Sequence, residues 1–103
     1  MSGVSYPYRY AYETVAASQT GQVLGTAGAN GDYLHRLIIS VVTATTAGVT
    51  IIDGSTSIVI LTGSATVIPG IYPVEVNAVS ISGPWSVTTG AGATVVAIGI
   101  FSV

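Results

Sequence analysis

The amino-acid sequence predicts an all-β fold, a single antiparallel domain built as a sandwich or a barrel. Val, Ile and Thr, which favour strands, dominate its 103 residues. No segment repeats its apolar residues with the 3.6-residue period of an amphipathic helix. Turn signals containing glycine recur at short intervals along the chain. Short strands separated by closely spaced turns are typical of a sandwich or a barrel.

The first 20 residues differ in character from the rest and are interpreted as an N-terminal arm or edge strand, ahead of a sandwich domain at 21–103. An extended strand within 8–17 would place alternate side chains on one face. Tyrosine is enriched at protein interfaces, so we expect this segment to contact a neighbouring molecule. The alternatives are a strand packed on the domain's own core and a platform for carbohydrate. The residues expected at the interface are Tyr6, Tyr8, Arg9, Tyr10 and Tyr12.

Turn signals place the later strands in order. A loop of small residues at 25–32 separates a short strand at 22–24 from a long strand at 33–43. Asp53-Gly54 supplies the positive φ angles of a two-residue turn and predicts a hairpin between the next two strands. Those two strands are expected at 48–52 and 57–61. Further turns at Pro69-Gly70, Ser82-Gly83-Pro84 and Gly90-Ala91-Gly92 bound expected strands at 65–68, 72–81, 85–88 and 93–101.

The expected strands at 33–43 and 93–101 are apolar on both faces. Regular alternation in the first of them places one set of apolar side chains opposite another, with Leu37, Ile39 and Val41 on one side and Leu34, Ile38 and Val42 on the other. Strands of a lone antiparallel sandwich usually have one face in water. Only 6% of the residues are charged, where about 25% is typical. We therefore expect a homo-oligomer or a larger assembly that covers the second face.

Composition excludes several classes of function. Two arginines and no lysine cannot form the basic face that nucleic-acid binding needs, and they exclude a lysine nucleophile and a P-loop. Without cysteine there is no disulfide or thiolate metal site. The uncharged stretch at 76–103 is interrupted by glycine and proline, and the N-terminus has no basic and apolar signal pattern. We therefore expect no membrane anchor and no signal peptide.

No catalytic, cofactor or metal site is predicted, and we expect the chain not to be an enzyme. His35 is the only histidine, and regular alternation places Ser40 on the opposite face from it, so no nucleophilic triad is expected. The four carboxylates lack the pattern of an acid–base pair or a calcium loop. His35 and Arg36 are instead expected at an intermolecular contact. Trp85 and Phe101 are expected to anchor the core.

Several short motifs in the later part of the chain resemble, in their order, small β proteins encoded among the structural genes of tailed bacteriophages. The resemblance covers about residues 31–101 and excludes the tyrosine-rich start. The motifs are Gly31-Asp-Tyr-Leu-His-Arg-Leu-Ile-Ile, Ile52-Asp-Gly-Ser, Ser82-Gly-Pro-Trp-Ser-Val-Thr-Thr-Gly-Ala-Gly-Ala-Thr-Val and Ala97-Ile-Gly-Ile-Phe101.

The family that the motifs resemble is that of capsid decoration, or cement, proteins. The resemblance implies a β-sandwich or jelly roll, commonly trimeric, on the outer surface of the virion capsid. The implied partners are the major capsid protein and further copies of the chain itself, with no enzymatic activity. The alternative is a head-fibre or tail-associated β-module that binds host surface glycans.

Overall fold

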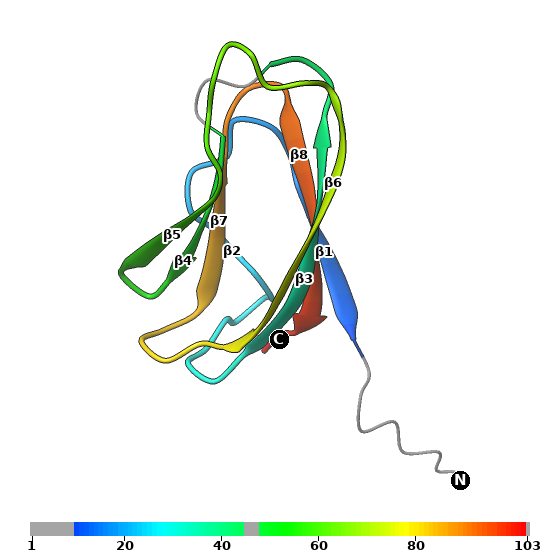
Figure 1. Cartoon of the computed structure of the whole chain (residues 1–103). Helices are drawn as coiled ribbons and strands as arrows, with labels where there is room; N and C mark the ends of the chain where they lie inside the picture. The colour runs from blue at the N-terminus through cyan, green and yellow to red at the C-terminus, as the bar shows by residue number, and fades with distance from the viewer. Residues whose placement is uncertain (1–9, 45–47, 103) are drawn as a thin grey trace, which may run out of the picture.

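The computed structural model describes residues 10–44 and 48–102, which form two antiparallel β-sheets packed face to face (Figure 1). This part of the chain contains no helix. The first sheet has the strand order β1-β8-β3-β6 and the second has the order β2-β7-β4-β5. The strands are β1 (Ala11–Val15), β2 (Gln22–Val23), β3 (Tyr33–Val41), β4 (Val49–Asp53), β5 (Thr56–Leu61), β6 (Gly70–Val79), β7 (Trp85–Thr89) and β8 (Ala93–Ile100).

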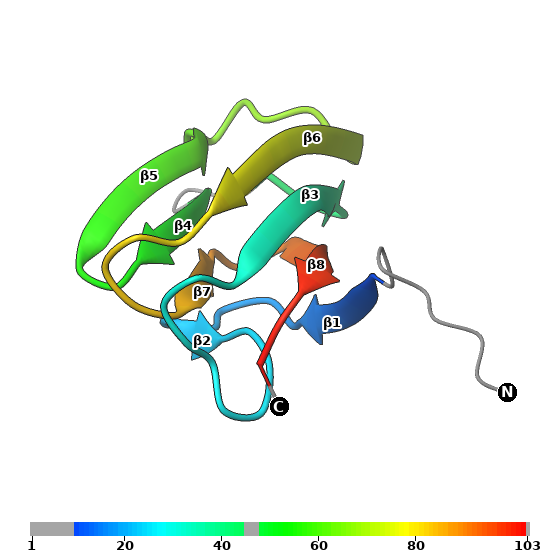
Figure 2. The same ribbon diagram turned by 90° about the horizontal axis from the view of Figure 1, so that it is seen from below.

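The strand order is that of a jelly roll, in which the chain passes between two facing sheets. The neighbours β1 and β8 come from opposite ends of the described chain, and β3 lies between β8 and β6. Seen from below, β1 and β2 lie at one side of the sandwich, and β5 and β6 lie at the other (Figure 2). The predicted antiparallel β-sandwich with a jelly-roll arrangement is confirmed.

One expected strand is absent from the structure. Residues 65–68 were predicted to pair in a sheet but form part of the connection from β5 to β6. The hydroxyl of Ser64 accepts a hydrogen bond from the amide of Thr66 at 3.1 Å, and the carbonyl of Ser64 accepts one from Val67 at 3.3 Å. These local bonds satisfy the backbone in a turn, in competition with a sheet. The segment can therefore cross between the sheets.

The core lies between the two sheets. The largest fully buried side chains include Leu24, Leu34, Leu37, Ile39 and Ile51. Burying a side chain of this size contributes about 1.5–3 kcal/mol relative to leaving it in water.

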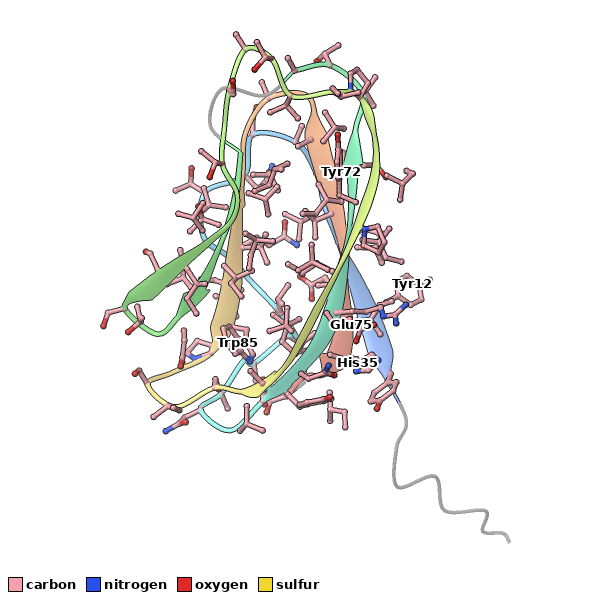
Figure 3. All side chains as sticks on the ribbon, viewed as in Figure 1. Tyr12, His35, Tyr72, Glu75 and Trp85 are labelled. Carbon is pink, nitrogen blue, oxygen red and sulfur yellow. The ribbon has the colours of Figure 1, made fainter. Side chains whose placement is uncertain are left out.

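Of the two expected core anchors, Trp85 is 2% exposed and lies in this core. Its indole N–H donates a hydrogen bond to the carbonyl of Asp32 at 3.0 Å, so the polar end of the ring is also satisfied (Figure 3). Phe101 follows the last strand, is half-buried and packs against the edge of the core.

A β-bulge in β3 turns the side chains of Leu34 and His35 to the faces opposite those expected from regular alternation. The pairing register shifts between Leu34 and Arg36 against both neighbouring strands. One extra residue reverses the alternation of side chains, so Leu34 points into the core together with Leu37. His35 lies on the outer face of the first sheet for the same reason. Ser40, expected on the opposite face from His35, shares this outer face, since its neighbours Ile39 and Val41 are buried.

Candidate interaction surface

Three of the four carboxylates hold loops in place. Asp53 accepts hydrogen bonds from two backbone amides in the turn after β6, at 2.9 and 3.0 Å. Asp32 accepts hydrogen bonds from the amides of Ala29 and Ser102, at 3.1 and 2.9 Å. Glu13 accepts one from the amide of Gly25 at 2.8 Å. These carboxylates are used as structural acceptors, as is common for acidic side chains beside turns.

The fourth carboxylate belongs to a group of side chains on the outer face of the first sheet. Residues from just before β1, from the first part of β3 and from the facing part of β6 meet there; His35 and Glu75 are labelled in Figure 3. We call this group the aromatic–polar cluster. It consists of Tyr10, Tyr33, His35, Arg36, Glu75 and Asn77.

The aromatic rings of the cluster hold the residue that leads into β1 against β3. The ring of Tyr10 stacks on the imidazole of His35, with centroids 4.6 Å apart and planes at 12°. Tyr33 lies beside both rings, with centroid distances of 6.2 Å to Tyr10 and 5.9 Å to His35. Paired rings of this kind contribute about 0.5–1.5 kcal/mol beyond the area that they bury. The stacked ring of Tyr10 thus helps to hold the start of the edge strand β1 in place, in addition to the backbone pairing of β1 with β8.

Hydrogen bonds connect these rings to the ion pair of the cluster. The hydroxyl of Tyr33 donates to Oδ1 of Asn77 at 2.9 Å and lies 3.2 Å from Nδ1 of His35. The amide Nδ2 of Asn77 donates to Glu75 at 3.2 Å, and the guanidinium of Arg36 donates to the other carboxylate oxygen of Glu75. Asn77 has a φ of 51°, a left-handed conformation that asparagine tolerates better than most residues. The bulge in β3 and the left-handed residue Asn77 in β6 therefore bring the polar side chains of the cluster together.

The electrostatics of the cluster follow from these contacts. The pKa of Glu75 is lowered from 4.5, first by the hydrogen bond from Asn77 and then by the charge and hydrogen bond of Arg36. The pKa of Tyr33 is raised from 10.0, chiefly by its partial burial and further by Tyr10 and Glu75 nearby. Glu75 is therefore ionised and Tyr33 is neutral at neutral pH, so the cluster carries one compensated ion pair.

The lowered pKa of Glu75 predicts a pH dependence of stability. Because the unfolded carboxyl takes up its proton first as the pH falls, the contribution of Glu75 is fully present above about pH 4.5 and is lost as the pH falls through the lower folded value. The wild type should therefore melt higher than Glu75→Gln at pH 7, and this difference should shrink to zero in acid. Thermal melting of both proteins from pH 7 to pH 2.5 measures it. A difference that is independent of pH would contradict the assignment.

Apolar side chains continue the outer face beyond the cluster. One row across all four strands consists of Thr14, Val96, Ile38 and Pro73, in register. Tyr12, opposite Ile98 of β8, is 73% exposed. At the outward positions of β1, β8, β3 and β6, the charged side chains among the described residues are Arg36 and Glu75, which pair with each other. We call this surface the outer face.

The outer face brings together four of the residues expected at an interface. Tyr10, Tyr12, His35 and Arg36 all lie on it, whereas Tyr6, Tyr8 and Arg9 lie outside the described residues. Sequence reasoning missed Tyr33, Glu75 and Asn77. The position of Tyr33 two residues before His35 was a usable signal, since alternate strand residues share a face. Glu75 and Asn77 are placed by the pairing of β3 with β6, which the local sequence does not reveal.

Within 10–44 and 48–102, no group of three or more His, Asp or Glu side chains could hold a metal ion. No helix in that part of the chain is long and apolar enough to cross a membrane. No family model, curated protein or solved structure matches the chain.

Proposed function

We propose that the chain is a structural virion protein, a bacteriophage capsid decoration protein that stabilises the head by bridging capsid subunits. It acts without catalysis, as a homotrimer on the outer surface of the capsid, where its partner is the major capsid protein. The observation that carries this proposal is the outer face. Its row of one threonine and three apolar side chains crosses all four strands, and its ion pair is internally compensated.

The chemistry of the outer face suits a contact between proteins. A large, contiguous patch of exposed apolar surface on a folded domain often marks a site of interaction with another protein. A decoration protein binds in many copies, and several simultaneous contacts turn modest single contacts into stable attachment. The formal net charge of −2 keeps mutual repulsion low where copies crowd on a shell.

The resemblance of the motif order to phage decoration proteins supports the virion assignment. The jelly roll supports it only by analogy, because this architecture occurs in capsid proteins, in lectins and in enzymes of the cupin type. The engagement of Asp32, Asp53 and Glu13 with backbone amides agrees with a role that needs no catalytic carboxylate.

A glycan-binding module is the second candidate, and the exposure of Tyr12 favours it. Sugar rings pack on exposed aromatic rings, and Arg36 of the cluster pairs with Ile98 from the side opposite Tyr12. In that case the outer face would point away from the virion, and Tyr12→Ala would abolish glycan binding without affecting attachment to heads. A decoration protein should bind heads but should bind no soluble glycan.

A charge placed in the middle of the outer face tests the proposal. Ile38 is half-buried there, between Val96 and Pro73. Ile38→Glu should weaken binding to purified heads that lack the protein by about tenfold or more, because docking would bury an unpaired carboxylate. Co-sedimentation with the heads measures the binding, and circular dichroism confirms that the variant is folded.

Ile81→Glu is the matched control. Ile81 is 79% exposed and lies in the turn between β6 and β7, outside the outer face. This variant should bind heads as the wild type does. If Ile38→Glu is folded and binds heads with unchanged affinity, the outer face is not the docking surface and the proposal fails.

A further inference from the structure

Each sheet ends in two edge strands, β1 and β6 in the first and β2 and β5 in the second. An edge strand presents a row of unpaired backbone N–H and C=O groups, to which a strand of another molecule can add. Folded proteins protect such edges with proline, charge, short length, irregular backbone or a covering segment. The four edges of this sandwich differ in how far they are protected.

Three of the four edges are protected. β6 carries Pro73, the charged Glu75 and the left-handed Asn77. β2 is only two residues long. β1 and β2 are also tied to each other across the sandwich, because the side-chain amide of Gln22 donates to Glu13 at 2.8 Å and to the carbonyl of Thr14 at 3.1 Å.

The fourth edge, β5, has little of this protection. Its sequence Thr-Ser-Ile-Val-Ile-Leu has no charge, proline or glycine. Four residues, 56–59, pair with β4 in regular register, and the irregularity between Val49 and Thr50 affects only its far end. Ile58 and Val59 are 41% and 62% exposed. Within the described residues, β4 is the only strand that pairs with β5. A neutral and largely apolar edge of this kind favours the addition of a strand.

Residues 1–9 have the chemistry of a strand that would fit this edge. Before Arg9 they contain no charged side chain, which matches the uncharged β5. Pro7 favours an extended chain at its own position and at Tyr6 before it. In an extended chain, Tyr6 and Tyr8 share one face, from which their rings could cover exposed apolar side chains. Nine extended residues span about 30 Å, which is enough to leave one molecule and pair with another.

We propose that residues 1–9 of one copy add as an extra strand to β5 of the next copy. The inference deepens the proposed function, since it rests on the homo-oligomer proposed there and specifies how the copies join. The donor segment leads into β1, and the acceptor is β5, on the opposite side of the sandwich in both ribbon views (Figures 1 and 2). The contact therefore joins two different surfaces. Repeated around an axis, such a head-to-tail contact closes into a ring, and three copies give the trimer.

Engineered cysteine pairs test this contact directly, because the chain contains no cysteine of its own. Tyr8→Cys is combined in turn with Ser57→Cys, Ile58→Cys and Val59→Cys in the full-length protein. Disulfides form only when the Cβ atoms approach to about 3.5–4.5 Å, so the pair in register should cross-link under mild oxidation. Electrophoresis without reductant should then show covalent oligomers that disappear on reduction.

Two controls separate the possible geometries. Tyr8→Cys combined with Val42→Cys, an exposed position after β3 of the other sheet, should cross-link no more than Tyr8→Cys does alone. Val59→Cys alone should give no disulfide. If Val59→Cys alone forms a covalent dimer, β5 pairs with β5 of a second copy, and the proposal is wrong. It is also wrong if none of the three pairs cross-links although the protein is oligomeric.

A charge on the edge gives an independent readout. Val59→Lys should shift the protein from oligomer to monomer in sedimentation velocity, whereas Val42→Lys, at a still more exposed position after β3, should not. If Val59→Lys leaves the oligomer intact, the arm contact fails but the proposed homo-oligomer stands. If the wild type itself sediments as a monomer at micromolar concentration, the proposed homotrimer fails as well.

Discussion

Trp85→Ala should lower the free energy of unfolding by about 3–5 kcal/mol, the usual cost of truncating a fully buried aromatic side chain. The ring is 2% exposed, and its indole N–H donates to the carbonyl of Asp32. Truncation therefore leaves a cavity between the sheets and removes one of the two donors to the carbonyl of Asp32, which also accepts a hydrogen bond from the amide of Ser80. Urea denaturation at fixed protein concentration measures the loss, since the stability of an oligomer depends on concentration.

Two further variants make the Trp85 result specific. Trp85→Phe keeps most of the buried ring but removes the N–H, so it should lose less stability than Trp85→Ala. Phe101→Ala should also lose less, because Phe101 is only half-buried at the edge of the core. If Trp85→Ala melts within a few degrees of the wild type, the indole does not fill the core as the structure has it.

Asp32→Ala should lower the free energy of unfolding by about 2–4 kcal/mol, because it leaves three partly buried donors without their acceptor and a buried donor left unpaired costs about 1–3 kcal/mol. The carboxylate of Asp32 accepts hydrogen bonds from the amides of Ala29 and Ser102 and, at 2.6 Å, from the hydroxyl of Ser102. It thereby joins the loop before β3 to the segment after β8. Thermal melting measures the overall loss.

Asp32→Asn separates the charge of this side chain from its shape. Its amide keeps one acceptor oxygen, so it should retain part of the stability. Amide hydrogen exchange locates the effect: in Asp32→Ala, protection should fall first at Ala27 and Gly28, whose amides donate to the carbonyl of Ser102. Uniform loss of protection across all strands, with no earlier loss at these two amides, would contradict a local role for Asp32.

The parts of the fold that depend on local signals were predictable from the sequence. Asp53-Gly54 marked the hairpin of β4 and β5, and Gly54 has the expected positive φ of 61°. Asp53 itself ends β4 without a positive φ, so the two turn residues are Gly54 and Ser55. Alternation placed Tyr10 and Tyr12 on one face, where the structure has them. The tyrosine-rich start was interpreted as an arm or an edge strand; residues 11–15 form an edge strand, with Val15 buried in the core.

The parts that depend on pairing between distant strands could not be read from the sequence. The bulge between Leu34 and Arg36 is set by the registers of β6 and β8, and it reversed the expected facing of Leu34. The same pairing brings Glu75 to Arg36, which is 39 positions away in the chain. Residues 65–68 have strand-forming side chains but form a turn, because their backbone finds local partners.

The amount of the chain on purified virions tests the central claim, its role as a capsid decoration protein, most directly. Quantitative mass spectrometry of gradient-purified particles gives its ratio to the major capsid protein, and antibody labelling in electron micrographs gives its position. The proposal predicts a fixed and reproducible ratio, with labelling over the outer surface of the head. Its absence from purified particles, or labelling confined to the tail, would contradict the proposal.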